Sequence, residues 1–314
     1  EIGDMSLSAQ DKVLRPCILW NDTRAAAEAE EMDRNPIFRR RTGNIVFPGF
    51  TAPKLAWVRR WEPEIFAKVA KVLLPKDYLR LWLSSEHVAE MSDAAGTSWL
   101  DVGARAWSDD LLAATGLQRA QMPHLVEGSE VSGMLRRDLA ARFGMRCDVV
   151  IAGGGGDNAA SAIGVGVVRG GEAFVSLGTS GVLFAASDSY QPDPASAVHS
   201  FCHAVPKTWH QMGVILAASD ALSWFGRVLG AAPADMTSGL GPLQAPSSTL
   251  FLPYLGGERT PHNDAVIRAS FLNLDHSTDH IAMTRAVMEG VTYAVRDSFD
   301  ALISTGTKIE RLLA

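Results

Sequence analysis

The stretch VVIAGGGGDNAASAIGVG, from Val149 to Gly166, decides the fold class. A short β-branched apolar run is followed by four glycines and then by small residues at helical spacing, a pattern that predicts a strand, a tight turn and a helix. Asp157 then falls at the start of the helix. Because a strand that passes through a glycine turn into a helix is typical of α/β proteins, we expect an α/β fold.

A glycine-rich hairpin is predicted just downstream. Ala173 to Leu177 and Val182 to Ala185 read as two strands joined by Gly178-Thr179-Ser180-Gly181. The backbone amides and two hydroxyl groups of such a turn can cradle a phosphate chain, although a hairpin without a ligand fits the same residues. We place a domain boundary near Gly170, which divides the chain into residues 1–169 and 170–314.

The first third of the chain predicts a strand and several helices. Val13 to Trp20 reads as a short strand, and Asn21-Asp22-Thr23 then offers an N-cap for a helix that begins at Arg24. Ala52 to Leu74 carries apolar residues at helical spacing, interrupted by Pro63. We therefore expect two helices that meet at Trp61-Glu62.

The last third predicts a strand between two helices. Ser219 to Gly230 reads as a capped amphipathic helix, Leu250 to Pro253 as a strand, and Gly256 to Asp264 as a polar loop. From Ile281 to Ser304, apolar residues recur every four positions, and Gly306 follows as a C-terminal cap. This last helix is the clearest element of the sequence.

The composition favours a globular protein with two cores. The chain has 314 residues, of which 47% are apolar and 20% charged. The net charge of −6 implies no broad basic surface for nucleic acid, and we read the run from Arg39 to Arg41 as a solvated helix face.

The cysteines and the hydropathy pattern favour a cytoplasmic location. Cys17, Cys147 and Cys202 lie far apart, without the spacing of a disulfide framework or a zinc site. No apolar run reaches the roughly 18 residues that a membrane span needs, and residues 1–8 lack signal-peptide character. We expect a soluble protein in a reducing compartment.

Two places on the chain suit the binding of a polyol. Asp157 and Asn158 set a carboxylate beside an amide at a helix start, where the carboxylate could accept a proton from a hydroxyl group. A simple N-cap explains the same aspartate. Trp20, with Asn21 next to it, could present an indole to the apolar face of a sugar, but a tryptophan at a strand end is commonly core.

The sequence contains several long blocks, which are GFTAPKLAWVRR (Gly49 to Arg60), LLPKDYLRLWL (Leu73 to Leu83), MSDAAGTSWLDV (Met91 to Val102), GGGDNAASAIGVG (Gly154 to Gly166), SLGTSGVLF (Ser176 to Phe184), HSFCHAVP (His199 to Pro206) and FLPYLGGERTPHN (Phe251 to Asn263). The blocks cover nearly the whole chain and are far more specific together than any one of them. Together and in register they resemble the FGGY family of carbohydrate kinases, and the likeness is greatest to members that phosphorylate D-xylulose.

The resemblance implies an actin-like ATPase fold with two ribonuclease-H-like domains and a cleft between them. The domains would be a sugar-binding domain over residues 1–169 and a nucleotide-binding domain over residues 170–314. By matching positions, Asp157 corresponds to the catalytic base. The substrate ligands implied in the same way are Trp20, Asn21 and Asn158, and the nucleotide ligands are Gly178, Thr179, Ser180 and Ser219. No residue is implied as a metal ligand.

The chain departs from the family pattern at both ends. The family's opening strand pair with an Asp-x-Gly-Thr motif and its glycine-rich adenosine motif have no counterpart here, so we expect the first and last elements of the fold to be missing. Glu1-Ile2-Gly3 stands where related kinases carry Met-His-Gly, whose histidine contacts the sugar. Asn273 and Ala282 stand in place of a glycine and a polar residue that are usual in the second family signature, and Trp61 ends the first signature.

The resemblance implies phosphorylation of D-xylulose to D-xylulose 5-phosphate, with ATP and Mg²⁺ as cofactors. A pentulose would be the partner, and a homodimer is kept open as the assembly. A kinase for another ketose or polyol, such as ribulose, is the neighbouring hypothesis. A non-catalytic sugar-binding module of the same fold is a rival from a different class, and a structural or chaperone-like ATPase ranks last.

Overall fold

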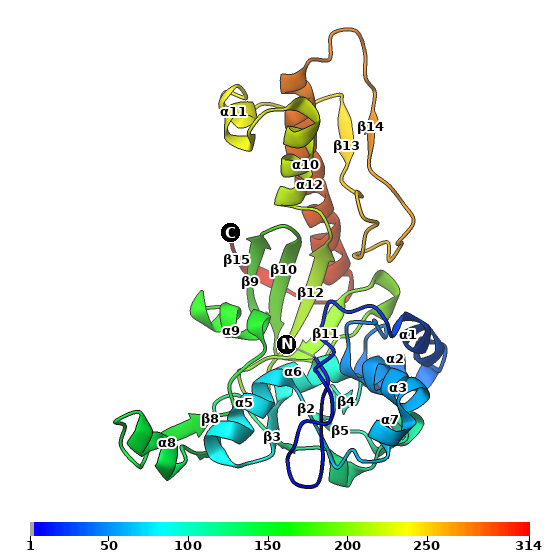
Figure 1. Ribbon diagram of the computed structural model, residues 1–314. Helices are drawn as coiled ribbons and strands as arrows, with labels where there is room; N and C mark the ends of the chain where they lie inside the picture. Colours follow the sequence, from blue (N-terminus) through cyan, green and yellow to red (C-terminus); the bar gives the residue numbers. More distant parts are fainter. Residues whose placement is uncertain (1–2) are drawn as a thin grey trace. The chain divides into compact units, whose positions relative to one another are not determined.

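The computed structural model describes residues 3–314 and divides them into two compact units (Figure 1). The first unit comprises residues 3–170, with Ala186–Tyr190 and Ser200–His210 returning to it later in the chain. The second comprises Gly171–Ala185, Gln191–His199 and Gln211–Ala314. The assignment of a sugar-binding domain to residues 1–169 and a nucleotide-binding domain to residues 170–314 stays a prediction.

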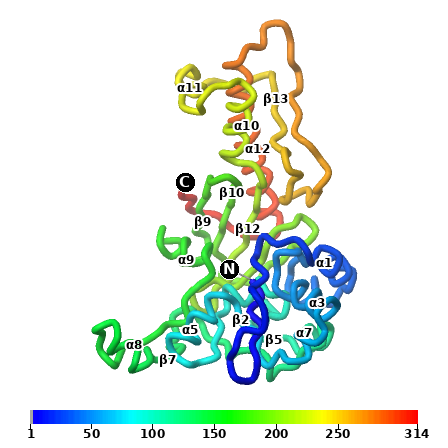
Figure 2. The backbone as a smooth tube through the Cα atoms, in the orientation of Figure 1, coloured from blue at the N-terminus to red at the C-terminus, as the bar shows by residue number. Residues whose placement is uncertain are grey.

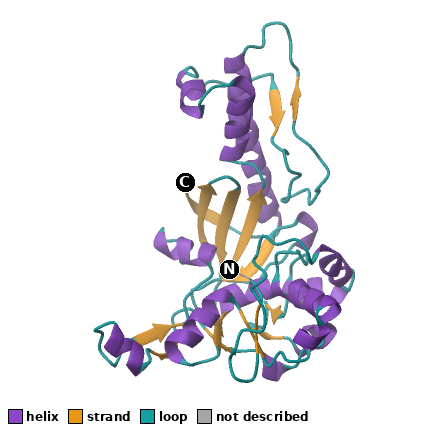
Figure 3. Ribbon diagram, in the orientation of Figure 1, coloured by secondary structure: helices purple, strands orange, loops and turns teal. Residues whose placement is uncertain are grey.

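The first unit packs short helices around pairs of short strands, as Figure 3 shows by colour. Strands β1 and β2, β4 and β5, and β7 and β8 pair antiparallel, and β3 pairs parallel with β6. The helices are α1 (Ala26–Asp33), α2 (Pro36–Thr42), α3 (Thr51–Trp61), α4 (Pro63–Phe66), α5 (Pro75–Ser84), α6 (Met91–Ala94), α7 (Asp109–Thr115), α8 (Arg137–Arg142) and α9 (Asp157–Gly164). The strands are β1 (Met5–Leu7), β2 (Lys71–Leu73), β3 (Val88–Glu90), β4 (Leu100–Asp101), β5 (Ala106–Trp107), β6 (His124–Val126), β7 (Val131–Met134) and β8 (Val150–Ala152).

The core of the first unit is built on large apolar side chains from several helices. Trp99 is fully buried and its indole nitrogen donates to Thr115 Oγ1 at 2.9 Å, so the ring is packed without an unsatisfied polar atom. Phe38, Leu55 and Leu111 pack into the same cluster from α2, α3 and α7. This core therefore packs α2, α3 and α7 against one another.

The N-terminal strand prediction is wrong. Val13 to Trp20 forms two isolated bridges, Leu7 with Val13 and Asp4 with Ile18, instead of a strand. The apolar residues of the run are interrupted by Arg15 and Pro16, so only Ile18 is fully buried. The helix that follows begins at Ala26, and its N-cap residue, Ala25, makes no side-chain capping bond, so the predicted cap at residues 21–23 is also wrong.

The helix break at Pro63 is confirmed. Helix α3 ends at Trp61 and α4 begins at Pro63, where the proline occupies the first helical position and loses no hydrogen bond. Helix α4 ends at Phe66, however, and residues 71–73 form strand β2. The predicted second helix is therefore shorter than its apolar spacing suggested.

A mixed five-stranded sheet in the order β11-β12-β10-β9-β15 belongs for the most part to the second unit. The glycine hairpin is confirmed, because β9 and β10 pair antiparallel with Gly181 opposite Leu177. At the edge of the sheet β15 pairs parallel with β9. The strands are β9 (Gly171–Leu177), β10 (Gly181–Ser187), β11 (His199–Cys202), β12 (Trp209–Ile215) and β15 (Ile309–Leu313).

Three helices and a second small sheet complete this unit. Helix α12 (His280–Ser304) packs along β13 (Leu250–Leu252), which pairs antiparallel with β14 (Ser270–Leu272). Figure 2 follows the backbone from β13 through a long loop to β14 and on into α12. The remaining helices are α10 (Ser219–Leu229) and α11 (Pro233–Ser238).

The predicted helices of the second unit are confirmed. The carboxylate of Asp279 caps α12 by accepting from the amide of Ala282 at 2.8 Å, and Gly306 follows its end with a φ of 92°. Helix α10 begins at Ser219 and ends at Leu229, and Gly230 follows as its C-cap with a φ of 67°. Within residues 3–314, no helix combines the length and the apolar character needed to cross a bilayer.

Candidate functional site

Asp157 is the first residue of α9 and its side chain is exposed to solvent. The N-cap position belongs to Gly156, which has no side chain, so Asp157 does not serve as a simple N-cap. Its Oδ1 accepts from the backbone amide of Asn158 at 2.8 Å and from the Nδ2 of the same residue at 3.1 Å. The carboxylate and the amide that the sequence paired therefore lie in direct contact.

The glycine turn before Asp157 is held by close backbone contacts. Gly153 and Gly154 donate hydrogen bonds to the carbonyl oxygens of Glu130 and Gly128, at 2.8 and 2.9 Å. A Cβ atom on Gly153 would overlap the carbonyl group of Glu127, and Gly154 has a φ of 85°. The turn therefore requires glycine at these two positions for reasons of space and backbone conformation.

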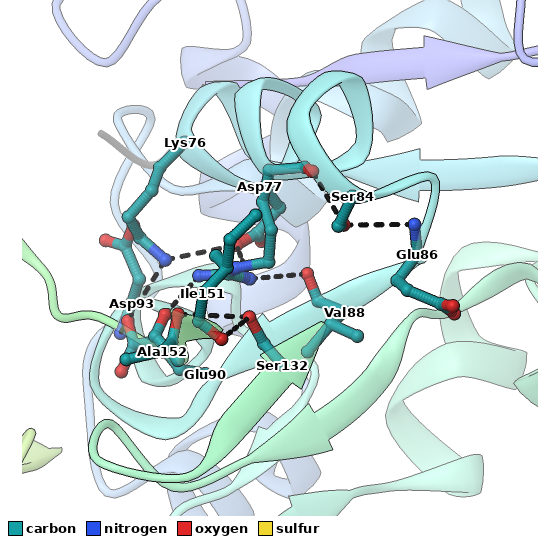
Figure 4. Close-up of polar contacts among 12 residues, drawn as sticks. Lys76, Asp77, Ser84, Glu86, Val88, Glu90, Asp93, Ser132, Ile151 and Ala152 are labelled. Carbon is teal, nitrogen blue, oxygen red and sulfur yellow. Dashed lines mark hydrogen bonds and ion pairs between the residues drawn. The ribbon is translucent and has the colours of Figure 1, made fainter. Parts of the chain in front are cut away.

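A cluster of charged side chains, which the sequence did not reveal, contacts this turn, and Figure 4 shows its members Lys76, Asp77, Glu90 and Asp93. The Nζ of Lys76 lies 3.0, 3.3 and 3.6 Å from carboxylate oxygens of three residues, which are Asp77, Glu90 and Asp93. Arg80 donates to Asp77 Oδ1 at 2.9 Å, to the carbonyl oxygen of Val88 at 2.7 Å, and to the carbonyl oxygen of Gly153. The cluster thus contacts the glycine turn directly.

Burial and the neighbouring charges together set the pKa values of the side chains in the cluster. Burial lowers the pKa of Lys76, but the surrounding carboxylates outweigh this effect and hold the pKa above its usual value. Burial raises the pKa of Asp77 and raises that of Asp93 to about 6, although Lys76 opposes both shifts. Buried ions are costly unless they are paired, so these side chains depend on one another.

Trp20 and Asn21 lie in the loop before α1, and both are exposed. The Trp20 side chain is 57% accessible to solvent, so it is not a core residue. A turn closed by Asp22 N donating to Leu19 O at 3.1 Å surrounds the pair, and the carbonyl oxygen of Trp20 would lie 2.9 Å from a Cβ on Gly49. The backbone at Trp20 is therefore held in place while its ring stays available.

The glycine hairpin and the start of α10 form one hydrogen-bonded unit. Gly178 O accepts from the amide of Ser219 at 3.0 Å and from its hydroxyl group, and Thr179 O accepts from Ala218 N at 2.9 Å. Inside the turn, Gly178 N donates to Ser180 O at 2.9 Å. The residues predicted to bind the nucleotide thus come together, although Gly178 and Ser219 are 41 positions apart in the sequence.

The tip of the hairpin is open to solvent. Gly178, Thr179 and Ser180 are exposed, and neither hydroxyl group has a hydrogen-bond partner among residues 3–314. Gly181, by contrast, is buried, and a Cβ there would lie 2.7 Å from Ile215 Cγ1. The base of the hairpin is fixed by packing while its tip keeps free donors.

The described residues contain no preformed metal cage. Among residues 3–314, no three His, Cys, Asp or Glu side chains come together in a way that could hold a metal ion. Mg²⁺ in phosphoryl-transfer sites is held by one or two carboxylates together with substrate phosphates and water, so it needs no such cage. The site expected at Glu1-Ile2-Gly3 lies outside the described residues except for Gly3.

Two family models match the chain. The N-terminal domain of the FGGY family of carbohydrate kinases matches residues 3–164, and the C-terminal domain of the same family matches residues 173–314.

Xylulose kinases are among the relatives of highest identity. The xylulose kinase of Escherichia coli (strain K12) is 50% identical over 309 residues, which are 98% of this chain and 64% of that protein. The xylulose kinase of Klebsiella pneumoniae is 49% identical over 313 residues, which are 99% of this chain and 65% of that protein. The chain thus spans slightly less than two thirds of the length of these relatives.

Solved structures share the fold. A crystal structure of a "xyloylose kinase" from Brucella ovis superposes with a TM-score of 0.98 at 62% identity and covers 99% of this chain and 64% of that one. A gluconate kinase from Lactobacillus acidophilus superposes with a TM-score of 0.91 at 26% identity, over 99% of this chain and 65% of that one. The two-domain carbohydrate kinase fold with mixed α/β content therefore accompanies more than one substrate.

Proposed function

Because the chain belongs to the FGGY family of carbohydrate kinases, we propose that the protein transfers the terminal phosphate of ATP to D-xylulose and forms D-xylulose 5-phosphate. The identity of 50% to a xylulose kinase supports this choice of sugar. The observation that carries the chemistry is Asp157, an exposed carboxylate in contact with Asn158 at the end of a rigid glycine turn.

In the proposed reaction the terminal hydroxyl oxygen of the sugar attacks the γ-phosphorus of ATP. A new oxygen–phosphorus bond forms, the bond between the γ-phosphorus and the bridging oxygen breaks, and ADP leaves. The hydroxyl proton passes to the carboxylate of Asp157, which acts as the general base. Asn158 and the ring of Trp20, with Asn21 beside it, bind the sugar.

The nucleotide is assigned to the hairpin. The exposed turn from Gly178 to Ser180 offers the amides and hydroxyl groups of Thr179 and Ser180 to phosphate oxygens, and Ser219 holds Gly178 from α10. Mg²⁺ would neutralise charge on the phosphates and would be held chiefly by phosphate oxygens and water.

The assigned base is tested with the full-length protein and two variants. Asp157→Ala removes the carboxylate, and we expect sugar-dependent ADP release to fall about 100-fold to 10,000-fold. Asp148→Asn is a matched control, because Asp148 is an exposed carboxylate of the same unit that pairs with Arg146. An Asp157→Ala variant that retains the wild-type rate would refute the assignment.

A kinase for another ketose or polyol remains the second candidate, because the fold also accompanies gluconate kinase activity in a structure 26% identical to this chain. A panel of D-xylulose, ribulose and gluconate, compared by kcat/KM, separates the two candidates. A non-catalytic sugar-binding module would bind sugar in calorimetry without releasing ADP.

The proposal also covers location and partners. We place the protein in the cytoplasm, with a pentulose as its small-molecule partner and without nucleic acid or membrane partners, and we keep a homodimer open as its assembly. The net charge of −6 supports the exclusion of nucleic acid, because a surface that binds nucleic acid would be basic. Light scattering on the full-length protein tests the dimer.

A further inference from the structure

We propose that Ser92 and Arg80 are positioning residues that fix the location of the Asp157 carboxylate by holding the turn before it. The inference rests on the proposed role of Asp157 as the base. Neither residue touches Asp157 itself, and both act on the backbone of the turn that ends at Gly156.

Ser92 holds the last residue of the turn. Its Oγ accepts from the backbone amide of Gly156 at 2.9 Å, so a buried side chain binds the residue directly before Asp157. The same hydroxyl group donates to Glu90 Oε2 at 2.7 Å. Because a hydroxyl group has a single proton and Ser92 donates it to Glu90, only a lone pair of Oγ is left for Gly156.

Glu90 is itself held in one position, and this fixes the direction in which the Ser92 hydroxyl group donates its hydrogen bond. It is fully buried, and its two oxygens accept from the amides of Ser92 and Asp93 at 2.7 and 2.9 Å, which caps α6. Lys76 approaches Glu90 Oε1 to 3.3 Å and balances its charge. Ser92 therefore has one orientation that satisfies its neighbours, and that orientation points its lone pair at Gly156.

Arg80 holds the first residue of the turn. One nitrogen of its guanidinium group donates to the carbonyl oxygen of Gly153, while the other bonds to Asp77 and to Val88 O. Because the group is planar and buried, these bonds fix its position. The turn is thus gripped at both ends by side chains from α5 and α6.

Asp93 leaves little room for the turn to move. A Cβ on Gly156 would lie 3.2 Å from Asp93 Oδ1, so the backbone at Gly156 already rests against this carboxylate. The other backbone hydrogen bonds that hold the turn, donated by Gly153 N and Gly154 N, act two or more residues earlier. Ser92 is therefore the side chain whose loss should displace Asp157 while leaving the start of the turn in place.

The test uses full-length protein with three substitutions of Ser92 and one control. We expect Ser92→Ala to lower kcat about 10-fold to 100-fold and to leave the KM for ATP within about twofold, because a misplaced base slows the chemical step more than nucleotide binding. Ser92→Thr keeps the hydroxyl group and should restore most of kcat. Ser92→Cys keeps the volume with a weak acceptor, and should behave as Ser92→Ala does.

Ser84→Ala is the matched control. Ser84 is also buried on the same unit, and its hydroxyl group accepts from Glu86 N at 3.1 Å and donates to Arg80 O at 2.8 Å, at the end of α5 (Figure 4). We expect this variant to keep the wild-type kcat. An equal loss of kcat in both alanine variants would assign the effect to general destabilisation and overturn the proposal.

A double variant separates positioning from stability. If Ser92 acts through Asp157, Ser92→Ala should cause no further loss of kcat in an Asp157→Ala background. A full additional loss there would overturn the inference, as would a wild-type kcat in both Ser92→Ala and Ser92→Cys.

Hydrogen exchange distinguishes failure of this inference from failure of the proposed function. We expect the Gly156 amide to exchange at least about tenfold faster in Ser92→Ala than in Ser84→Ala, whatever reaction the protein catalyses. Unchanged exchange would overturn the role of Ser92. A wild-type protein that releases no ADP with any sugar would instead refute the proposed function.

Discussion

The backbone amide and the hydroxyl group of Ser219 both donate to the carbonyl oxygen of Gly178, which joins the first residue of α10 to the glycine hairpin. A carbonyl oxygen bound twice in this way has little freedom to rotate. The peptide group between Gly178 and Thr179 is therefore held in one orientation in an exposed part of the hairpin.

Ser219→Ala should weaken nucleotide binding. Loss of one hydrogen bond is worth about 0.5–1.5 kcal/mol, so we expect the KM for ATP to rise about two- to tenfold while the KM for the sugar stays unchanged. Ser223→Ala is the control, since Ser223 lies one turn further along α10 and donates to Ser219 O at 3.0 Å. Steady-state kinetics with each substrate varied in turn measures both KM values. An unchanged KM for ATP in Ser219→Ala would mean that Ser219 serves only the fold.

Trp20→Ala should raise the KM for the sugar without unfolding the protein. An aromatic ring against the apolar face of a sugar contributes about 1 kcal/mol, equivalent to roughly fivefold in KM. The ring is 57% exposed, so its removal leaves no cavity. Trp61→Ala provides the comparison, because Trp61 is 64% exposed at the end of α3, and equal KM values for both variants would argue against a sugar contact at Trp20.

Gly290→Ala should strongly destabilise the second unit. A Cβ at this position of α12 would overlap the carbonyl group of Phe251 on β13, so the helix and strand would have to separate at a cost of about 1–3 kcal/mol. Gly164→Ala in α9 meets no atom within 4 Å and should stabilise by up to about 1 kcal/mol. Urea denaturation of both variants checks the opposite signs.

Asp4→Asn should stabilise the protein more at pH 8 than at pH 5. Burial raises the pKa of Asp4 to about 6, against the bond from Ser6 Oγ at 3.1 Å and the charges of Arg15 and Lys54, which lower it. The folded state then binds more protons than the unfolded state between pH 4 and pH 6, so this residue lowers the free energy of unfolding as the pH rises through that window.

Above pH 6 the ionised Asp4 costs about 3 kcal/mol, and an asparagine avoids that cost. Asp109→Asn is the control, because Arg119 bonds to this exposed carboxylate and lowers its pKa. Free energies of unfolding at the two pH values should diverge for Asp4→Asn alone, and a pH-independent difference would contradict the assignment of the buried charge.

The elements that rest on local signals were predictable from the sequence. The β9–β10 hairpin, α10, α12 and the helix break at Pro63 each carry their own turn, cap or proline signal, and all appear in the structure. The strand predicted from Val13 to Trp20 is wrong, because a β-branched and apolar composition does not ensure that a neighbouring strand pairs with the segment.

The candidate site was predictable only in part. The contact between Asp157 and Asn158 follows from their adjacency, whereas the grip on their turn by Arg80 and Ser92 joins residues 73 and 64 positions apart. Nothing in the spacing of Lys76, Asp77 and Arg80 shows that the buried carboxylates of Glu90 and Asp93 lie next to Lys76.

The parallel pairing of β15 with β9 ties almost the last residues described to the first strand of the second unit. The paired residues lie very far apart in the sequence. Because closing the long loop between them costs entropy, we expect this pairing to form late in folding. During translation β9 and β10 emerge from the ribosome long before β15. The edge of β9 that pairs with β15 therefore stays unpaired until β15 emerges. Nascent chains stalled before Ile309 should therefore be sensitive to aggregation and should need chaperone protection until translation passes that point.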